Sequence, residues 1–290
     1  MNAAEAGPLV SAQWLAAHLH DPDLRIVHVA LDRTIYDRQH LPGAIFADLH
    51  IHLAKPGARA ETGTAKREYL VPTQKEVADS LAGWGVAPGT RIVFYDDENN
   101  RQAIRGYWLM RLYGFPRDRV HLLDGGLKVW LAEERPTTSE TATSARVAAT
   151  ERLHERDESL IATADQVLAW SHAASAPGGP TSILDVRTID EFLGTDVRAA
   201  RGGRIPGAKQ RLFLDFVAPD GRLRTGAEAL AILQGTGVNP EEVRATYCQG
   251  GVRAALAWFV LHELAGLDEV RNYAESWEEW GNRADLPVEK

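Results

Sequence analysis

The chain has 290 residues, 44% of them hydrophobic and 25% charged, and it carries a formal net charge of −8 at pH 7. This length predicts two domains of ordinary globular composition, and the acidic balance argues against general nucleic-acid binding. The single cysteine excludes an internal disulfide framework, and no apolar run approaches the roughly 18 residues that cross a bilayer.

The N-terminal stretch Met1–His20 lacks a basic start followed by an apolar core, so we do not expect it to be a signal peptide. Together with the lone thiol, this favours a cytoplasmic protein.

Short apolar runs alternate with amphipathic segments in both halves of the chain. The apolar runs predict strands, and the segments with apolar residues every three to four positions predict helices. Such alternation favours α/β domains, each with a parallel sheet flanked by helices. In chain order, strands are expected at 24–30 and 91–96, a helix at 163–172, a strand at 181–187, a helix at 226–237, a strand at 244–248 and a helix at 253–266.

The segment Glu133–Ser159 separates the two halves. It is rich in Thr, Ser, Ala and charged residues and has little apolar periodicity, which is typical of a linker. We therefore expect an N-terminal domain at 1–135, a linker at 136–158 and a C-terminal domain at 159–290.

Three sequence blocks occur twice, in the same order in each half. "HLPGAIF" at 40–46 is echoed by "RIPGAKQ" at 204–210, and "DGGLKVW" is echoed by "AESWEEW". Between these blocks, Tyr95–Gly114 aligns without gaps with Tyr247–Gly266. The repeats predict two homologous domains.

The only cysteine, Cys248, lies between a predicted strand and a predicted helix, in the loop "CQGGVR". Ligands of open α/β sheets bind at this edge, where the strands end. Gly250 and Gly251 allow successive N–H groups to turn inward, and Arg253 adds a cation. A cysteine in such a loop is expected to be a reactive thiolate, whereas the alternative for a lone cysteine is a small buried apolar residue.

Over nearly its whole length the chain resembles the tandem-domain rhodanese family of sulfurtransferases. The motifs that carry the resemblance are "HLPGA" with "RIPGA", "ILDVRTIDEF", "TYCQGGVRAA" and "RNYAESWEEWG". In this family the C-terminal domain is catalytic and the N-terminal domain has lost its cysteine. The chain conforms, because the gapless alignment places Asp96 opposite Cys248, and an aspartate cannot carry a persulfide.

The resemblance implies a two-step sulfur relay through Cys248 that needs no metal or organic cofactor. The thiolate takes the outer sulfur of a small anionic donor such as thiosulfate, and the persulfide passes it to cyanide or to a thiol acceptor such as a thioredoxin-like protein. Neither a nucleic acid nor a membrane is implied as a partner. The residues expected to bind the donor are Arg187, Arg253, Gln249, Gly250, Gly251 and Val252.

Alternatives remain for Arg187 and for the donor. Arg187 could instead be an exposed residue paired with Asp190 or Glu191. The loop lacks the serine of mercaptopyruvate enzymes, and Tyr69 stands near the position of their histidine. It most resembles bacterial variants that begin with Cys-Gln and end with Arg, which favours thiosulfate and leaves 3-mercaptopyruvate as the alternative.

Two other classes of function compete with sulfur transfer. Cysteine-dependent phosphatases have five residues between the cysteine and the arginine of their loop, whereas four residues separate Cys248 from Arg253. The smaller loop suits a persulfide better than a tetrahedral phosphate. A non-catalytic interaction module would need neither the thiol nor the glycine pair.

Overall fold

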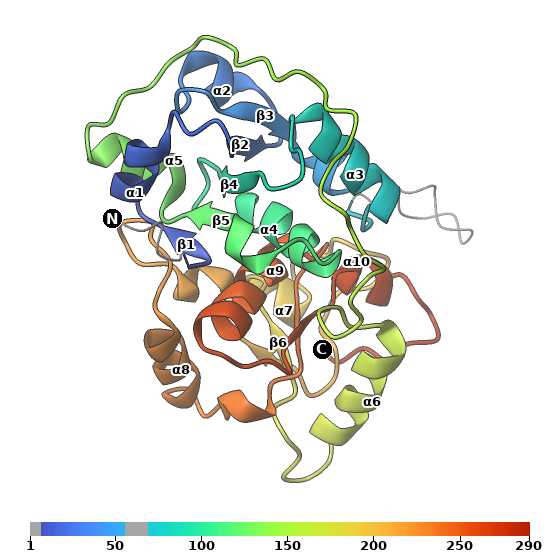
Figure 1. Cartoon of the computed structure of the whole chain (residues 1–290). Helices are drawn as coiled ribbons and strands as arrows, with labels where there is room; N and C mark the ends of the chain where they lie inside the picture. Colours follow the sequence, from blue (N-terminus) through green and yellow to red (C-terminus); the bar gives the residue numbers. More distant parts are fainter. Residues whose placement is uncertain (1–6, 56–68) are drawn as a thin grey trace. The chain divides into compact units, whose positions relative to one another are not determined.

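The chain forms two compact units, each built around a parallel sheet, in the computed structural model shown in Figure 1. The structure describes residues 7–55 and 69–290, so the first six residues of the N-terminal stretch lie outside the described residues. The prediction of α/β domains with parallel sheets flanked by helices is confirmed. By contacts, the first unit runs to Ala54 and includes Pro72–Asp157 and Ala218–Leu223, and the second contains Lys55–Val71, Glu158–Val217 and Arg224–Lys290.

The first unit contains a five-stranded sheet in the order β1-β5-β4-β2-β3, with every pair of neighbours parallel. Its apolar strands are buried on both faces because helices flank the sheet, as the continuous apolar run of the central strand predicts. The strands are β1 (Leu9–Val10), β2 (Leu24–Ala30), β3 (Ile45–Asp48), β4 (Arg91–Tyr95) and β5 (Val120–Leu123), and the α-helices are α1 (Ala12–His18), α2 (Thr34–Arg38), α3 (Gln74–Gly83), α4 (Ala103–Leu112) and α5 (Gly126–Ala132).

The second unit contains a four-stranded parallel sheet in the order β7-β6-β8-β9. Its strands are short, and β8 lies between β6 and β9. The strands are β6 (Ile183–Asp185), β7 (Lys209–Gln210), β8 (Ala245–Tyr247) and β9 (Arg271–Asn272), and the α-helices are α6 (Ala164–Ala174), α7 (Ile189–Leu193), α8 (Gly226–Gln234), α9 (Val252–Trp258) and α10 (Ser276–Trp280).

One predicted helix changes its type along its length. The sequence pattern predicts a single helix at 253–266, but the α-helix α9 ends at Trp258 and a π-helical segment continues from Phe259 to Leu264. Every residue of α9 except Arg253 is buried, so the segment is packed on all sides and its apolar pattern alone does not distinguish the two helix types.

The two sequence halves repeat the same contacts, as the repeated motifs predict. In the first unit, the buried hydroxyl of Tyr95 accepts the N–H of Leu41, which precedes Pro-Gly-Ala, at 3.1 Å. In the second, the buried hydroxyl of Tyr247 accepts the N–H of Ile205, which precedes the second Pro-Gly-Ala, at 3.2 Å. Each central strand is therefore tied to its Pro-Gly-Ala turn by the same tyrosine.

The predicted linker runs along the first unit. Its backbone pairs in both directions with His40 at Thr138, and further contacts join Val147 N to Ala82 O and His154 N to Tyr113 O. These hydrogen bonds account for its assignment to the first unit by contacts. We retain domain boundaries at 135 and 159, drawn from the sequence, as a proposal.

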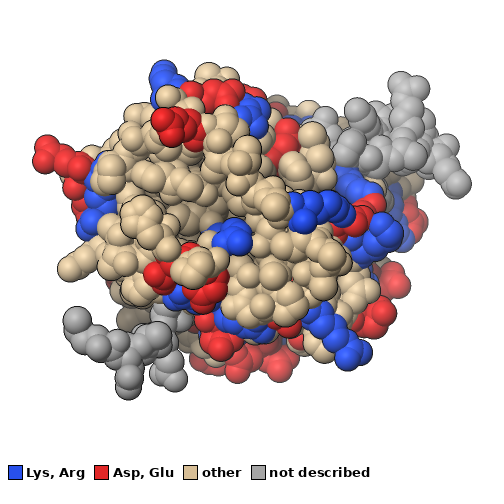
Figure 2. Space-filling view, turned by 45° about the horizontal axis from the view of Figure 1, so that its top comes forward, with Lys and Arg blue, Asp and Glu red and all other residues tan. Residues whose placement is uncertain are grey.

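Charged side chains of both signs are interspersed on the face drawn in Figure 2, around broad areas of uncharged residues. In the ranges 7–55 and 69–290, no helix has the length and apolar character needed to cross a membrane.

Asp96 follows β4 directly, in the position that Cys248 takes after β8. One carboxylate oxygen accepts the backbone N–H groups of Glu98 and Asn100, and the other accepts those of Gln102 and Ala103, at 2.7–2.9 Å. Burial raises the pKa of Asp96 to about 6 although these N–H groups lower it, so the carboxylate is the main form at pH 7. In the first unit, the loop after β4 thus directs backbone N–H groups inward, and the Asp96 carboxylate accepts them.

We expect Asp96→Asn to destabilise the protein by about 2–4 kcal/mol, because the amide NH₂ would face buried N–H donors that then lack an acceptor. Urea unfolding measures the loss. The matched control is Asp97→Asn, which alters a neighbouring, partly exposed carboxylate with one 3.4 Å contact to His28; it should cost under about 1 kcal/mol. Turnover per folded molecule should stay within about threefold for both variants. Equal costs for the two variants would contradict a special role for Asp96.

Candidate active site

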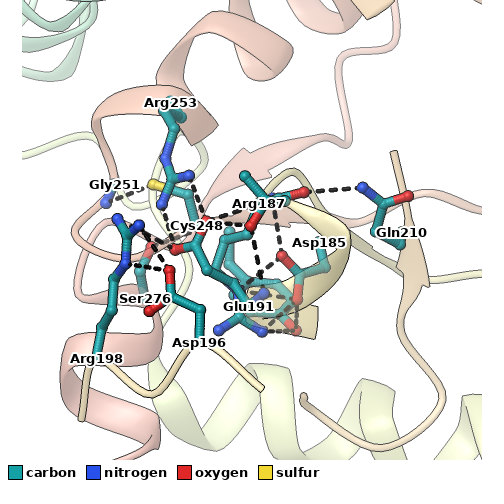
Figure 3. A network of polar contacts seen from close by, with 12 residues as sticks. Asp185, Arg187, Glu191, Asp196, Arg198, Gln210, Cys248, Gly251, Arg253 and Ser276 are labelled. Carbon is teal, nitrogen blue, oxygen red and sulfur yellow. Dashed lines mark hydrogen bonds and ion pairs between the residues drawn. The ribbon is translucent and has the colours of Figure 1, made fainter. Parts of the chain in front are cut away.

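Cys248 is the first residue after β8 and is buried, with 1% of its surface exposed. Its Sγ accepts the backbone N–H of Gly251 at 3.2 Å, and its own N–H donates to the hydroxyl of Ser276 at 3.1 Å (Figure 3). The carbonyl oxygen of Cys248 accepts the N–H of Trp277 at 3.0 Å. The thiol is therefore held at the carboxyl end of the sheet, on a backbone that is fixed on both sides.

Neighbouring atoms leave no room for a side chain at either glycine of the loop. Gly251 has φ +77°, and a Cβ there would lie 2.4 Å from the carbonyl oxygen of Ala274. A Cβ at Gly250 would lie 2.4 Å from the ring of Tyr69. The tight turn that aims an N–H at the sulfur thus depends on glycine at both positions.

Ser276 fixes the loop from the other side, and the sequence reasoning missed its role. Its hydroxyl donates to the carbonyl of Tyr273 at 2.7 Å while accepting the N–H of Cys248. Its φ is +50°, unusual for a serine, and the aligned residue in the first unit is Gly126, with φ +54°. The signal in the sequence was a serine standing where the first repeat has glycine.

Arg253 is held by a carboxylate that the sequence did not assign to it. Its Nη1 and Nη2 donate to the two oxygens of Glu191 at 2.7 and 2.8 Å, and the Glu191 side chain is only 1% exposed. Burial alone would raise the pKa of Glu191, but the hydrogen bonds and charge of Arg253 outweigh it and hold that pKa at about 2. Arg253 also interacts electrostatically with Cys248.

Arg187 lies in the same network but has a different partner from those considered. Its guanidinium donates to both oxygens of Asp185 and to the carbonyl of Gly203, and it stacks 4.6 Å above the ring of Trp277. With 1% of its surface exposed, the alternative of an exposed arginine paired with Asp190 or Glu191 is wrong. Its role in donor binding stays a prediction.

The remaining predicted site residues lie at the two ends of the loop. Gln249 donates from Nε2 to the carbonyl of Arg198 at 3.0 Å, and Val252 is the first residue of α9. The half-exposed Arg198 pairs with Asp196 at 2.7 Å and lies 3.7 Å from Glu191. Gln249 therefore links the loop to the segment that carries Arg198.

The loop offers a thiol, one amide donor on the sulfur and a neighbouring arginine, which together suit covalent chemistry at sulfur. Across the described parts of the chain, no group of three or more His, Cys, Asp or Glu residues is arranged to hold a metal ion.

Comparison with known proteins identifies relatives of both halves. A family model described as the rhodanese-like domain matches residues 11–133 and again residues 163–283. A thiosulfate sulfurtransferase of Corynebacterium glutamicum is 36% identical over 97% of this chain and 90% of its own length. A protein of Thermus thermophilus named sulfur carrier protein TtuD is 32% identical over 100% of this chain and 99% of its own length.

Solved structures share the fold. The crystal structure of YnjE matches with a TM-score of 0.78 at 23% identity, over 97% of this chain and 68% of that one. An anaerobic ergothioneine biosynthesis enzyme from Chlorobium limicola matches with a TM-score of 0.79 at 22% identity, over 98% of this chain and 70% of that one.

The pair of Glu191 and Arg253 predicts how stability responds to pH. Because the folded pKa of Glu191 is depressed, its contribution is present above the unfolded pKa of about 4.5 and is lost as pH falls toward 2. The free energy of unfolding of wild type should exceed that of Glu191→Gln at pH 7, and this difference should be smaller by about 1–2 kcal/mol at pH 3.5. Urea unfolding at the two pH values measures it, and a gap that is constant or wider at low pH would contradict the ion pair.

Proposed function

The chain belongs to the rhodanese family and is an enzyme of the thiosulfate sulfurtransferase type, and on that premise we propose that it moves a sulfane sulfur from thiosulfate to cyanide or a thiol through a persulfide on Cys248. The observation that carries the proposal is the position of the chain's single thiol. Cys248 lies at the carboxyl end of the sheet and accepts an inward-facing N–H on its sulfur.

The proposed reaction has two steps. In the first, the Cys248 thiolate attacks the outer sulfur of thiosulfate, the S–S bond of the donor breaks, and its electron pair leaves with sulfite. In the second, cyanide or a thiolate attacks the outer sulfur of the persulfide, and the Cys248 thiolate is regenerated. No proton or electron is gained or lost overall, and the kinetics should be ping-pong.

The loop supplies the groups that this relay needs. The N–H of Gly251 points at the Cys248 sulfur, which carries the negative charge in the thiolate, so it stabilises the attacking thiolate in the manner of an oxyanion hole. We propose that Gln249, Gly250 and Val252 line the path of the donor. Arg253 places its guanidinium beside the thiol, and Glu191 fixes the position of that guanidinium.

Thiosulfate is the proposed donor, and 3-mercaptopyruvate is the alternative. One relative named thiosulfate sulfurtransferase and others named putative thiosulfate sulfurtransferase, at 31–36% identity, support thiosulfate. The loop lacks the serine of mercaptopyruvate enzymes, and Tyr69, whose ring lies against Gly250, stands near the position of their histidine.

For the acceptor we propose cyanide or a thiol, including the thiol of a thioredoxin-like protein. A relative named as a sulfur carrier protein supports a protein acceptor in particular. We further propose that the N-terminal domain is catalytically inactive, because Asp96 fills its loop, and that the protein is cytoplasmic, because its one cysteine is unpaired.

Cys248→Ser should abolish sulfur transfer, because the chain has no other cysteine. Mass spectrometry after thiosulfate treatment should show a gain of one sulfur atom on wild type and none on the variant. A variant that kept a tenth of the activity would rule out the covalent relay. A wild type that gained no sulfur but hydrolysed a phosphate ester would instead support the phosphatase class.

Arg187→Ala should lower kcat/KM for thiosulfate about 10- to 150-fold, chiefly through KM, if its charge contributes one charged hydrogen bond to the donor. For the wild-type protein, kcat/KM should be higher with thiosulfate than with 3-mercaptopyruvate. Thermal unfolding is the control, because the variant also leaves the buried Asp185 without its cationic partner. A folded variant with unchanged KM would restrict Arg187 to a structural role.

A further inference from the structure

Glu191 accepts hydrogen bonds from both terminal nitrogens of Arg253, the last residue of the loop that begins at Cys248. The two hydrogen bonds from Arg253, at 2.7 and 2.8 Å, form a parallel pair, the strongest geometry between a guanidinium and a carboxylate. The two side chains are 13% and 1% exposed, so water screens the pair weakly. Arg253 therefore faces the sulfur as one half of an ion pair.

The other charges of the network are balanced in the same way. Figure 3 labels Arg187, Arg198 and Arg253 in this network, together with the carboxylates of Asp185, Glu191 and Asp196. Arg187 pairs with Asp185, and Arg198 pairs with Asp196. The network drawn in Figure 3 thus carries no net positive charge before the thiol ionises, although the proposed donor is a dianion.

We propose that Glu191 is a positioning and specificity-determining residue, which orients Arg253 on the loop and cancels enough of its charge to limit the affinity of the site for dianions. This inference rests on the proposed function. In each cycle the site must bind an anionic donor and release an anionic product, so a free cation would strengthen the binding of both. Glu191 lowers donor affinity and allows sulfite to leave.

A substitution can remove the charge of Glu191 while keeping its structural role in helix α7. Glu191 is the third residue of α7, where its Oε2 accepts the N–H of Thr188 in a capping box. Glutamine also serves in a capping box. Glu191→Gln therefore keeps the start of the helix and the size of the side chain, and it removes the negative charge.

The test measures anion binding and turnover on the same full-length variants. Sulfate, an unreactive dianion, serves as the probe in calorimetry, and thiosulfate with cyanide serves in kinetics. In Glu191→Gln, sulfate should bind about tenfold more tightly, because Arg253 loses its counter-charge. The KM for thiosulfate should fall, kcat should fall with it, and inhibition by sulfite should strengthen.

The matched control is Asp190→Asn, which removes an exposed carboxylate from the same helix. Its affinity for sulfate and its KM for thiosulfate should stay within about twofold of the wild-type values, because water and salt screen exposed charges. If Glu191→Gln instead weakens sulfate binding, or raises KM without affecting sulfite inhibition, the proposal is wrong.

A double variant keeps the test decisive if Glu191→Gln alone does not fold. Glu191→Gln combined with Arg253→Gln replaces the ion pair by two amides, leaves no unpaired buried charge and preserves the charge balance. Its sulfate affinity should stay within about threefold of wild type. A double variant that binds sulfate more than tenfold more weakly would show that Arg253 contributes a net cation in wild type, and would overturn the proposal.

Sulfate binding does not depend on turnover, so the two proposals can fail separately. Wild type without thiosulfate activity would refute the proposed donor, whereas unchanged sulfate affinity in Glu191→Gln would refute the role of Glu191.

Discussion

Each unit ends its central strand in a buried turn whose backbone N–H groups need an acceptor, and the choice of acceptor separates the two units chemically. An unsatisfied buried N–H costs about 1–3 kcal/mol, so the turn cannot remain empty at no cost. Asp96 meets the need with two oxygens and four N–H groups. Cys248 meets it with one sulfur, which accepts the N–H of Gly251 and can still form a bond to a second sulfur. The same turn thus holds a carboxylate in one unit and a thiol in the other.

A second constraint follows from burial of the arginines beside the thiol. A buried guanidinium without a partner is strongly destabilising, and both Arg187 and Arg253 are largely buried. Asp185 and Glu191 therefore stabilise the fold and at the same time remove positive charge from the site. On the proposed function, anion binding then relies little on free cations, which suits a net acidic protein whose proposed substrate and product are both anionic.

Local patterns in the sequence predicted several of the strands and helices, whereas contacts between residues distant in the chain could be seen only in the structure. The strand at 24–30 matches β2, and the helix predicted at 163–172 overlaps α6, because apolar periodicity is a local property. The partner of Arg253 is 62 positions away in the chain, and no local pattern marks it. Arg187 pairs with Asp185 because the end of β6 places the two side chains together, whereas the partners considered from the sequence were Asp190 and Glu191.

The units also exchange short segments, which the repeated motifs could not predict. Ala218–Leu223 belongs by contacts to the first unit, where Leu223 donates to Asp124 at 2.9 Å. Lys55–Val71 belongs to the second, where the ring of Tyr69 lies against Gly250. The N-terminal half of the sequence thus supplies a side chain that lies against Gly250 in the loop of Cys248. A separated C-terminal half would lack that ring, so the packing around the loop of Cys248 depends on a residue from the half of the sequence that contributes no cysteine.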